Sequence, residues 1–116
     1  MNNKKKIEIS YNKMLKVVDR DYRDINLNNR TNCYICKKCN HITKTKDIDK
    51  GVTPMFFTCE KCGDYAHSSF YKDIAPELTP TIEWYRPSLE ETLTLYPALQ
   101  QHILNGGLNH RKINKT

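Results

Sequence analysis

The fold of this chain is decided by residues 36–63, which read CKKCNHITKTKDIDKGVTPMFFTCEKCG. Two Cys-x-x-Cys pairs lie near the ends of this stretch, and 19 residues separate them. Two residues between cysteines let a tight turn aim both sulfurs at one tetrahedral ion, with bonds of about 2.3 Å. The spacing of the pairs is typical of a zinc site with four cysteine ligands. We therefore expect one structural Zn²⁺ with four ligands: Cys36, Cys39, Cys59 and Cys62.

The residue after the second cysteine of each pair supports this choice of ligands. That residue often needs a positive φ, and here it is Asn40 or Gly63, the types that tolerate this conformation best. A Cys33-x-x-Cys36 pair would place Lys37 there, which suits a positive φ poorly. Cys33 is therefore the spare cysteine, and its alternatives are replacement of one ligand or a free thiol.

Two histidines are the other candidate ligands, since His41 and His67 each follow a cysteine pair closely. With four well-spaced thiolates available, we interpret both as orienting or surface residues. Iron in a rubredoxin-like site would use the same four cysteines. The lysine-bearing loops offer no redox argument, so zinc is the preferred metal.

The composition makes a structural metal important for folding. Only 38% of the 116 residues are hydrophobic and the mean hydropathy is −0.75, so we do not expect a large core. Structural zinc contributes about 10–16 kcal/mol to the folding of small zinc peptides. Five cysteines in spaced pairs indicate a metal rather than disulfides in a reducing compartment. With neither a long apolar run nor a signal peptide, the sequence predicts a cytoplasmic protein without a membrane partner.

The formal charge of +6 is concentrated in the first half of the chain. Residues 1–50 carry 13 Lys or Arg against 6 Asp or Glu, whereas residues 51–116 carry 6 against 7. Such asymmetry is typical of a nucleic-acid-binding face. Four thiolates and Zn²⁺ would carry a net charge of about −2, however, so Lys37, Lys38 and Lys61 also have a simpler interpretation as local charge balance.

The sequence predicts a small α+β fold made of three consecutive segments. Residues 1–30 form an N-terminal amphipathic helix and a linker, with Ser10 or an earlier residue at the start of the helix. Residues 31–75 form a β-hairpin-like zinc ribbon that contains a polar loop over residues 44–51. Residues 76–116 form a Pro-rich extended segment, a C-terminal helical segment and a tail, which pack on the ribbon.

Local signals place strands and helices inside these segments. The expected extended pieces are residues 34–35, 55–57 and 68–71. Ser88-x-x-Glu91 is a capping box that opens a helix, and Pro97 starts a second helical piece. That piece ends at Asn105-Gly106-Gly107, where a left-handed conformation is expected.

A group of aromatic and basic residues is the candidate binding surface. Its members are Lys37, Lys38, Lys44, Trp84, Tyr85 and Arg86. The aromatic rings and the guanidinium offer stacking faces, and the lysines offer phosphate contacts. The alternative is that Trp84, the one tryptophan, is the main core residue and that Arg86 pairs with a carboxylate such as Glu83.

Several motifs together resemble those of a known family. They are Gly51-Val52-Thr53-Pro54, Cys59-x-x-Cys62-Gly63, Ser68-Ser69 and Glu83-Trp84-Tyr85-Arg86-Pro87. With these motifs the sequence resembles a family of small zinc-ribbon proteins of bacteriophages and bacterial genomes. The similarity extends through residues 104–108 and leaves the N-terminal helix outside. It implies a phage or prophage origin and a ribbon with four cysteine ligands, and it implies no settled activity.

Three classes of function compete. The first, which we expect, is a zinc-stabilised, non-catalytic protein that binds nucleic acid or a host or phage protein, in the host cytoplasm if it is phage-encoded. The second is a small metal-dependent nuclease, but the sequence lacks a His-Asn-His constellation. Its candidate residues are His41 and His67 with Asp47, Asp49 or Asp64. The third is a phage structural or assembly component, in the virion, that oligomerises through the apolar stripe of the N-terminal helix.

Overall fold

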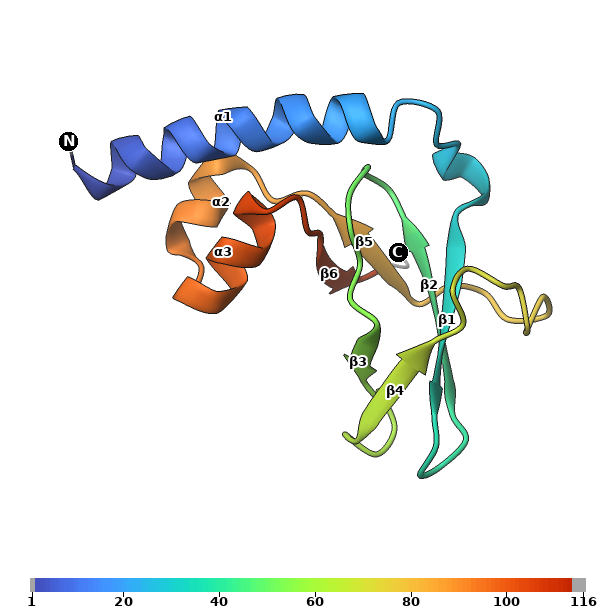
Figure 1. Cartoon of the computed structure of the whole chain (residues 1–116). Coiled ribbons are helices and arrows are strands. Elements are labelled where there is room, and N and C mark those ends of the chain that lie inside the picture. Colours follow the sequence, from blue (N-terminus) through green and yellow to red (C-terminus); the bar gives the residue numbers. More distant parts are fainter. Residues whose placement is uncertain (1, 114–116) are drawn as a thin grey trace. The chain divides into compact units, whose positions relative to one another are not determined.

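The computed structural model describes residues 2–113 and has a small α+β fold (Figure 1). Its residues group into two compact units. The helical unit contains the chain up to Ile25, together with Asp49–Thr53 and Tyr85–Asn109. The sheet unit contains Asn26–Ile48, Pro54–Trp84 and the residues from His110 onward. The units therefore interleave along the chain, in contrast to the three consecutive segments predicted, because pairing between distant segments decides which ones pack together.

Helix α1 (Asn3–Asp21) starts before its apolar stripe begins. Asn2 is its N-cap, since the Asn2 side chain accepts a hydrogen bond from the backbone N–H of Lys5 at 2.8 Å. The helix therefore begins before Ser10, at the earlier of its two predicted starts, and the lysine run lies on its first turns.

The apolar stripe of α1 is buried within the helical unit. Tyr11, Met14 and Val18 form a core with Ile103 of α3 (Pro97–Leu104). Partly buried residues around this core are Leu15, Tyr22, Leu89, Leu95, Leu99 and Leu104. The stripe is therefore covered by the chain's own C-terminal helices, so it is not the free surface on which the predicted oligomer depends.

Three local signals for the C-terminal helices are confirmed. Ser88 caps α2 (Leu89–Thr94) by accepting a hydrogen bond from the backbone N–H of Glu91 at 3.1 Å. Pro97 lies in the first turn of α3, and Gly106, with φ of 95°, follows its end. Among residues 2–113, none of the helices has the length and apolar character that crossing a membrane would need.

Within residues 2–113, six strands form one sheet in the order β3-β4-β1-β2-β5-β6 (Figure 1). Their bounds are β1 (Thr31–Cys36), β2 (Ile42–Asp47), β3 (Phe56–Thr58), β4 (Tyr65–Ser68), β5 (Ile82–Tyr85) and β6 (Asn109–Lys112). A short 3-10 helix, Leu27–Asn29, precedes the first strand. Strand β1 pairs antiparallel with β2 and β4, whereas β2 pairs parallel with β5.

The strand predictions need three corrections. Half of the predicted polar loop over residues 44–51 belongs to strand β2, which ends at Asp47 and whose alternation buries Thr43 and Thr45. The predicted strand over residues 68–71 instead ends at Ser68, since Phe70 and Tyr71 have φ of 55° and 63°. The extended segment around Trp84 is β5, a true member of the sheet.

The strand register divides the sheet into two faces. Tyr34 is the partner of Ser68, whereas the next residue, Ile35, is the partner of His67. Because neighbouring residues in a strand point to opposite faces, we call the Tyr34 side the core face and the Ile35 side the outer face. The aromatic core of the sheet unit consists of Tyr34, Phe57, Trp84 and His110.

Candidate metal centre

The first cysteine loop is closed by two backbone hydrogen bonds. Cys36 is the last residue of β1, and its N–H donates to the carbonyl of His41 at 3.0 Å. The N–H of Asn40 donates to the carbonyl of Cys36 at 2.8 Å. These bonds turn the chain back on itself, so that Cys36 and Cys39 face the same point.

The second loop repeats this geometry. The N–H of Cys59 donates to the carbonyl of Asp64 at 2.7 Å, and the N–H of Gly63 donates to the carbonyl of Cys59 at 3.0 Å. The donors and acceptors lie at the same offsets from the first cysteine as in the first loop. The two Cys-x-x-Cys sequences therefore fold into two equivalent turns.

The residues after the second cysteines have the backbone conformation that the sequence predicts. Asn40 has φ of 62° and Gly63 has φ of 80°. Glycine and asparagine adopt this left-handed conformation at the lowest cost, so each loop carries a residue suited to its turn.

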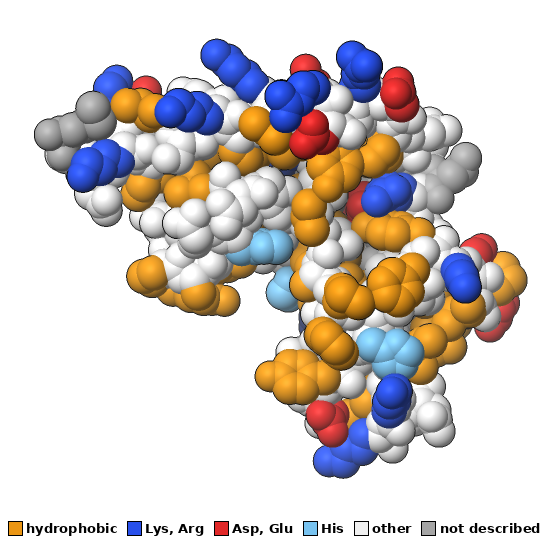
Figure 2. All heavy atoms as spheres, in the orientation of Figure 1, with side chains coloured by type: hydrophobic (Ala, Val, Ile, Leu, Met, Phe, Trp, Pro, Cys, Tyr) orange, Lys and Arg blue, Asp and Glu red, His pale blue; other side chains and the backbone are white. Residues whose placement is uncertain are grey.

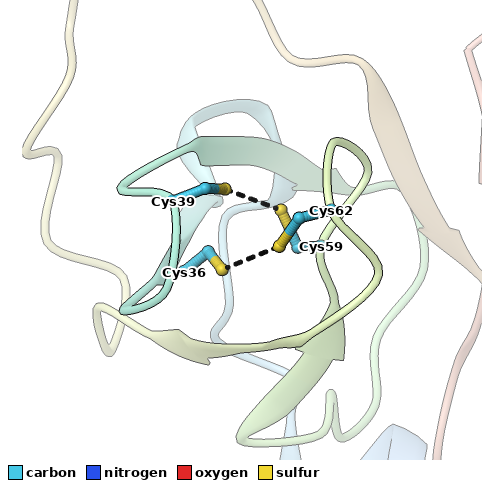
Figure 3. A group of neighbouring side chains, drawn as sticks. All are labelled: Cys36, Cys39, Cys59 and Cys62. Carbon is cyan, nitrogen blue, oxygen red and sulfur yellow. Dashed lines mark hydrogen bonds between the residues drawn. The ribbon is translucent and has the colours of Figure 1, made fainter.

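The two loops bring four sulfur atoms together (Figure 3). The Sγ atoms of Cys36 and Cys62 are 3.4 Å apart, those of Cys39 and Cys59 are 3.6 Å apart, and all four lie within 4.8 Å of one another. Ligands on a tetrahedral zinc ion with bonds of about 2.3 Å would be about 3.8 Å apart. The cluster is therefore able to hold a metal ion and is compatible with zinc.

Backbone amides favour the thiolate form in the second loop. A hydrogen bond from the N–H of Cys62, aided by that of Lys61, lowers the pKa of Cys59 to about 7. The N–H of Asp64 also lowers the pKa of Cys62, but hydrogen bonds with the neighbouring thiols of the cluster outweigh it and raise that pKa to about 12. Four sulfurs this close compete for negative charge, and a central cation is what allows all of them to be thiolates.

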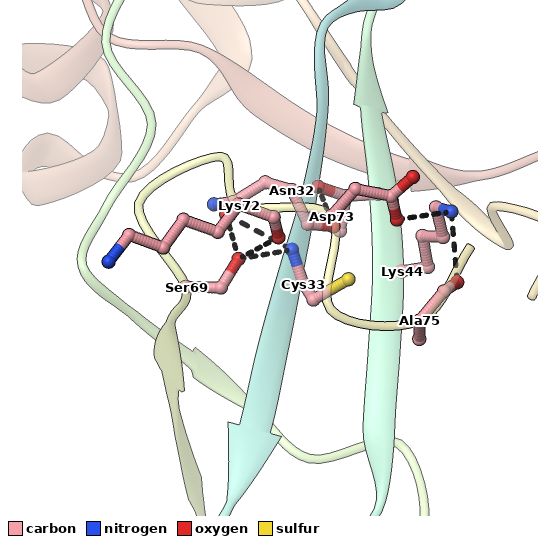
Figure 4. A network of polar contacts seen from close by, with 8 residues as sticks. Asn32, Cys33, Lys44, Ser69, Lys72, Asp73 and Ala75 are labelled. Atoms are coloured by element: carbon pink, nitrogen blue, oxygen red, sulfur yellow. Dashed lines mark hydrogen bonds and ion pairs between the residues drawn. The ribbon is translucent and has the colours of Figure 1, made fainter.

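Cys33 lies outside this cluster. Cys33 and Cys36 are three positions apart in β1, so their side chains point to opposite faces of the sheet. The Cys33 side chain is 1% exposed and lies near Lys44 and Ala75 (Figure 4). Burial raises the pKa of the Cys33 thiol. Strand alternation therefore explains why the spare cysteine does not join the other four.

The two candidate histidines do not join the cluster either. His41 follows the first loop, and His67 lies in β4 on the outer face. Within residues 2–113, the four cysteines are the one group of three or more His, Cys, Asp or Glu side chains close enough to hold an ion. The carboxylates considered for a nuclease, Asp47, Asp49 and Asp64, therefore form no such group with either histidine.

Lys44 is buried, although the sequence predicted it to be part of the candidate binding surface. It is 6% exposed, and its Nζ donates to Asp73 Oδ1 and to the carbonyl of Ala75, both at 3.1 Å (Figure 4). Alternation in β2 puts this side chain on the outer face, where residues 73–75 cover it. The predicted phosphate contact of Lys44 is contradicted by this burial, whereas Lys37 and Lys38 are exposed.

Trp84 has the core position of the alternative interpretation. It is 2% exposed, and its ring centroid lies 6.2 Å from that of Tyr34 and 5.7 Å from that of Phe57. A ring so enclosed presents no face to a nucleobase. The predicted stacking role of Trp84 is therefore wrong.

The neighbouring members of the predicted binding surface have partners of their own. In the helical unit, Tyr85 Oη donates to a carboxylate oxygen of Glu91, and the guanidinium of Arg86 donates to the carbonyl of Lys50. Glu83, the carboxylate predicted to pair with Arg86, lies in the sheet unit and pairs with Arg111 at 2.7 Å. The predicted Arg86–Glu83 pair is therefore wrong.

Sequence reasoning missed a buried polar centre at Asn32 (Figure 4). Its Oδ1 accepts hydrogen bonds from the N–H of Cys33 at 3.0 Å, from Ser69 Oγ at 3.0 Å and from the N–H of Tyr71 at 2.9 Å. Its Nδ2 donates to Ser68 Oγ at 2.9 Å. Asn32 follows an Asn-rich stretch, which gave no signal that this one side chain would be buried.

Comparison of the chain with protein families, curated proteins and solved structures finds no significant match. The resemblance to small phage zinc-ribbon proteins therefore stays a prediction, and the cysteine cluster carries the functional argument by its own geometry.

Proposed function

We propose that this chain is a zinc-stabilised, non-catalytic binding protein in which the two cysteine loops form a zinc ribbon. The observation that carries this proposal is the spacing of four sulfurs in two equivalent loops, which suits one tetrahedral Zn²⁺. The ligands would be Cys36, Cys39, Cys59 and Cys62.

A structural role for the ion follows from the ligand set. Catalytic zinc keeps an open position for water, whereas four thiolates fill a tetrahedral shell and weaken the Lewis acidity of the metal. The ion would instead clamp the end of β1 to the segment after β3, in a chain whose composition supports only a small core.

Nucleic acid and protein are the two classes of partner. Exposed lysines support an anionic partner, both in the first cysteine loop, at Lys37 and Lys38, and along the first turns of α1. A phage origin, as the family resemblance implies, would place this binding in the host cytoplasm. The alternative, a phage structural component, depended on a free apolar stripe on α1; that stripe is buried against α3, so a binding protein is the better proposal.

Zinc removal tests the proposal. The chain purified with zinc is expected to contain one zinc ion per molecule, and Cys59→Ser is expected to lose it together with the native fluorescence of Trp84, the one tryptophan. Chelation of the unmodified chain should have the same effect, since the metal contributes folding free energy directly.

The matched control is Cys33→Ala, because Cys33 is also buried and in the same strand as Cys36 but lies outside the cluster. This variant should keep one zinc ion, with a modest loss of stability from the small cavity. Native fluorescence and an unchanged thermal melt after complete chelation would overturn the proposal.

A further inference from the structure

Four large hydrophobic side chains gather on the surface of the sheet unit. Met55, Phe56, Tyr65 and Phe70 are between 55% and 75% exposed. Together with Lys37 and His67 they line a groove of about 400 Å³, called the aromatic groove below. Figure 2 shows hydrophobic side chains gathered over β3 and β4 beside a histidine and a lysine. So many neighbouring exposed rings in a chain with a small core indicate an interaction surface.

The strand register explains how the rings line up. Phe56 of β3 is the partner of His67 in β4, so both lie on the outer face. Tyr65 lies two positions from His67 in the same strand and therefore points to the same face, about 6.7 Å away along the strand. Phe56, His67 and Tyr65 therefore all lie on the outer face of the sheet.

Phe70 is held in the groove by a strained turn. Phe70 and Tyr71 both have positive φ, which is unusual for bulky residues. The N–H of Phe70 donates to Ser68 Oγ at 2.9 Å, and that of Tyr71 donates to the buried Asn32 Oδ1 at 2.9 Å. The Tyr71 hydroxyl is fixed by Asp47 Oδ2 at 2.9 Å. The turn thus fixes the backbone at Phe70, and backbone strain of this kind clusters at binding sites.

The charge of the groove favours an anionic partner. Its lining includes Lys37 and His67 and, among the residues described, no carboxylate. Lys37 is exposed, so its ammonium is accessible to a partner.

We infer that the aromatic groove binds single-stranded nucleic acid, with bases stacked on Phe56, Tyr65 and Phe70 and a phosphate at Lys37. This inference rests on the proposed binding function and names its partner class. Exposed rings beside a lysine suit nucleic acid, because flat bases stack on ring faces without sequence preference.

Binding of fluorescent dT12 and U12 to the zinc-loaded full chain, measured by anisotropy, tests the inference. We expect affinity that falls steeply as salt rises from about 50 mM. Phe56→Ala and Phe70→Ala should each weaken binding about tenfold, within the range for loss of one stacked base. Lys37→Gln should lower the slope of log affinity against log salt by about one.

Matched variants separate stacking from general surface effects. Phe56→Tyr should bind like the unmodified chain, whereas Phe56→Leu, which keeps apolar area but no ring face, should weaken binding like Phe56→Ala. Tyr96→Ala removes an equally exposed ring, 66% exposed, from the helical unit and should have no effect.

Zinc content and Trp84 fluorescence of every variant show whether the sheet unit is folded, so failure of the proposed function is seen separately. A folded, zinc-loaded chain that does not bind either oligonucleotide at about 50 mM salt would overturn the inference. Unchanged binding in both Phe56→Ala and Phe70→Ala would overturn the groove as the site. Loss of a protein partner in these variants, with no oligonucleotide bound, would assign the groove to a protein instead.

Discussion

Asn32 joins β1 to the strained turn after β4 through one buried amide. Its Oδ1 accepts three hydrogen bonds, and its Nδ2 donates a fourth to Ser68. Without this side chain, buried donors lose their acceptor and water does not replace it. The two successive positive-φ residues, Phe70 and Tyr71, would then lose much of what holds them in place.

Asn32→Ala is therefore expected to lower the free energy of unfolding of the zinc-loaded chain by about 2–3 kcal/mol. Urea unfolding followed by Trp84 fluorescence measures this change in the sheet unit. Asn28→Ala, at an exposed asparagine close by, should change it by less than about 0.5 kcal/mol. An equally small change in Asn32→Ala would show that the amide does not hold the turn.

Individual residues were predictable from sequence where the requirement is local. The positive φ of Asn40 and Gly63 follows from the geometry of a Cys-x-x-Cys turn, and the structure confirms it. The hydrogen bonds that Asn32 makes with Ser68 and Ser69 span 36 and 37 residues of sequence, so no local pattern indicates them.

Strand β2 shows how a polar sequence forms a buried strand. Ile42–Asp47 alternates threonine with lysine, and the β-branched threonines face the core while Lys44 lies beneath residues 73–75. The sequence alone favoured a loop here because lysine is rarely buried. Its long aliphatic stem packs on the sheet, and the ammonium reaches Asp73 and the Ala75 carbonyl.

Lys44→Met tests whether this buried lysine contributes to oligonucleotide binding, as the exposed lysine in the groove is expected to do. Because the Lys44 ammonium already has protein partners, its replacement should leave oligonucleotide affinity and its salt slope unchanged within about twofold, whereas Lys37→Met should lower both. Anisotropy titrations at two salt concentrations compare them. If Lys44→Met reduced the slope of log affinity against log salt by about one, Lys44 would contact a phosphate despite its burial.

The helices were predicted better than the strands. Each helix has its signals within a few residues: the stripe of α1, the Ser88 cap of α2 and Pro97 of α3. Parallel pairing of β2 with β5 joins Asp47 to Trp84, and the chain between them has no helix that would indicate a crossover. Pairing of this kind leaves no local pattern in the sequence.

The interleaving of the helical and sheet units has the same cause. Residues 76–116 were expected to pack as one segment on the ribbon, but Tyr85–Asn109 belongs to the helical unit and the residues on either side belong to the sheet unit. The boundary falls between Trp84 and Tyr85, inside a motif that the sequence presents as one cluster. Chain connectivity gives no sign of such a division.

The aromatic core of the sheet unit gives its stability a pH dependence. The His110 ring lies 4.7 Å from Phe57 and 5.4 Å from Trp84, centroid to centroid, and burial lowers the pKa of His110 below 6.5. The unfolded chain therefore binds a proton more readily than the folded one. The stabilisation is present above pH 6.5 and is lost as the pH falls through the lower, folded pKa.

Urea unfolding at saturating zinc should thus show a free energy of unfolding that decreases below pH 6.5. In His110→Phe this decrease should be smaller, because the ring contacts remain and the titrating group is gone. Protonation of the zinc ligands acts in both proteins and cancels in the difference. An identical pH dependence in the two proteins would contradict the burial of a neutral His110.

We propose that four cysteines from two equivalent loops hold one zinc ion. X-ray absorption fine structure at the zinc edge, on the chain purified with one zinc, measures the ligand atoms and their distances directly. We predict four sulfur neighbours at about 2.3 Å and no nitrogen or oxygen bound to the metal. A bound histidine nitrogen or water oxygen, at about 2.0–2.1 Å, would contradict the assignment of Cys36, Cys39, Cys59 and Cys62 as the full ligand set.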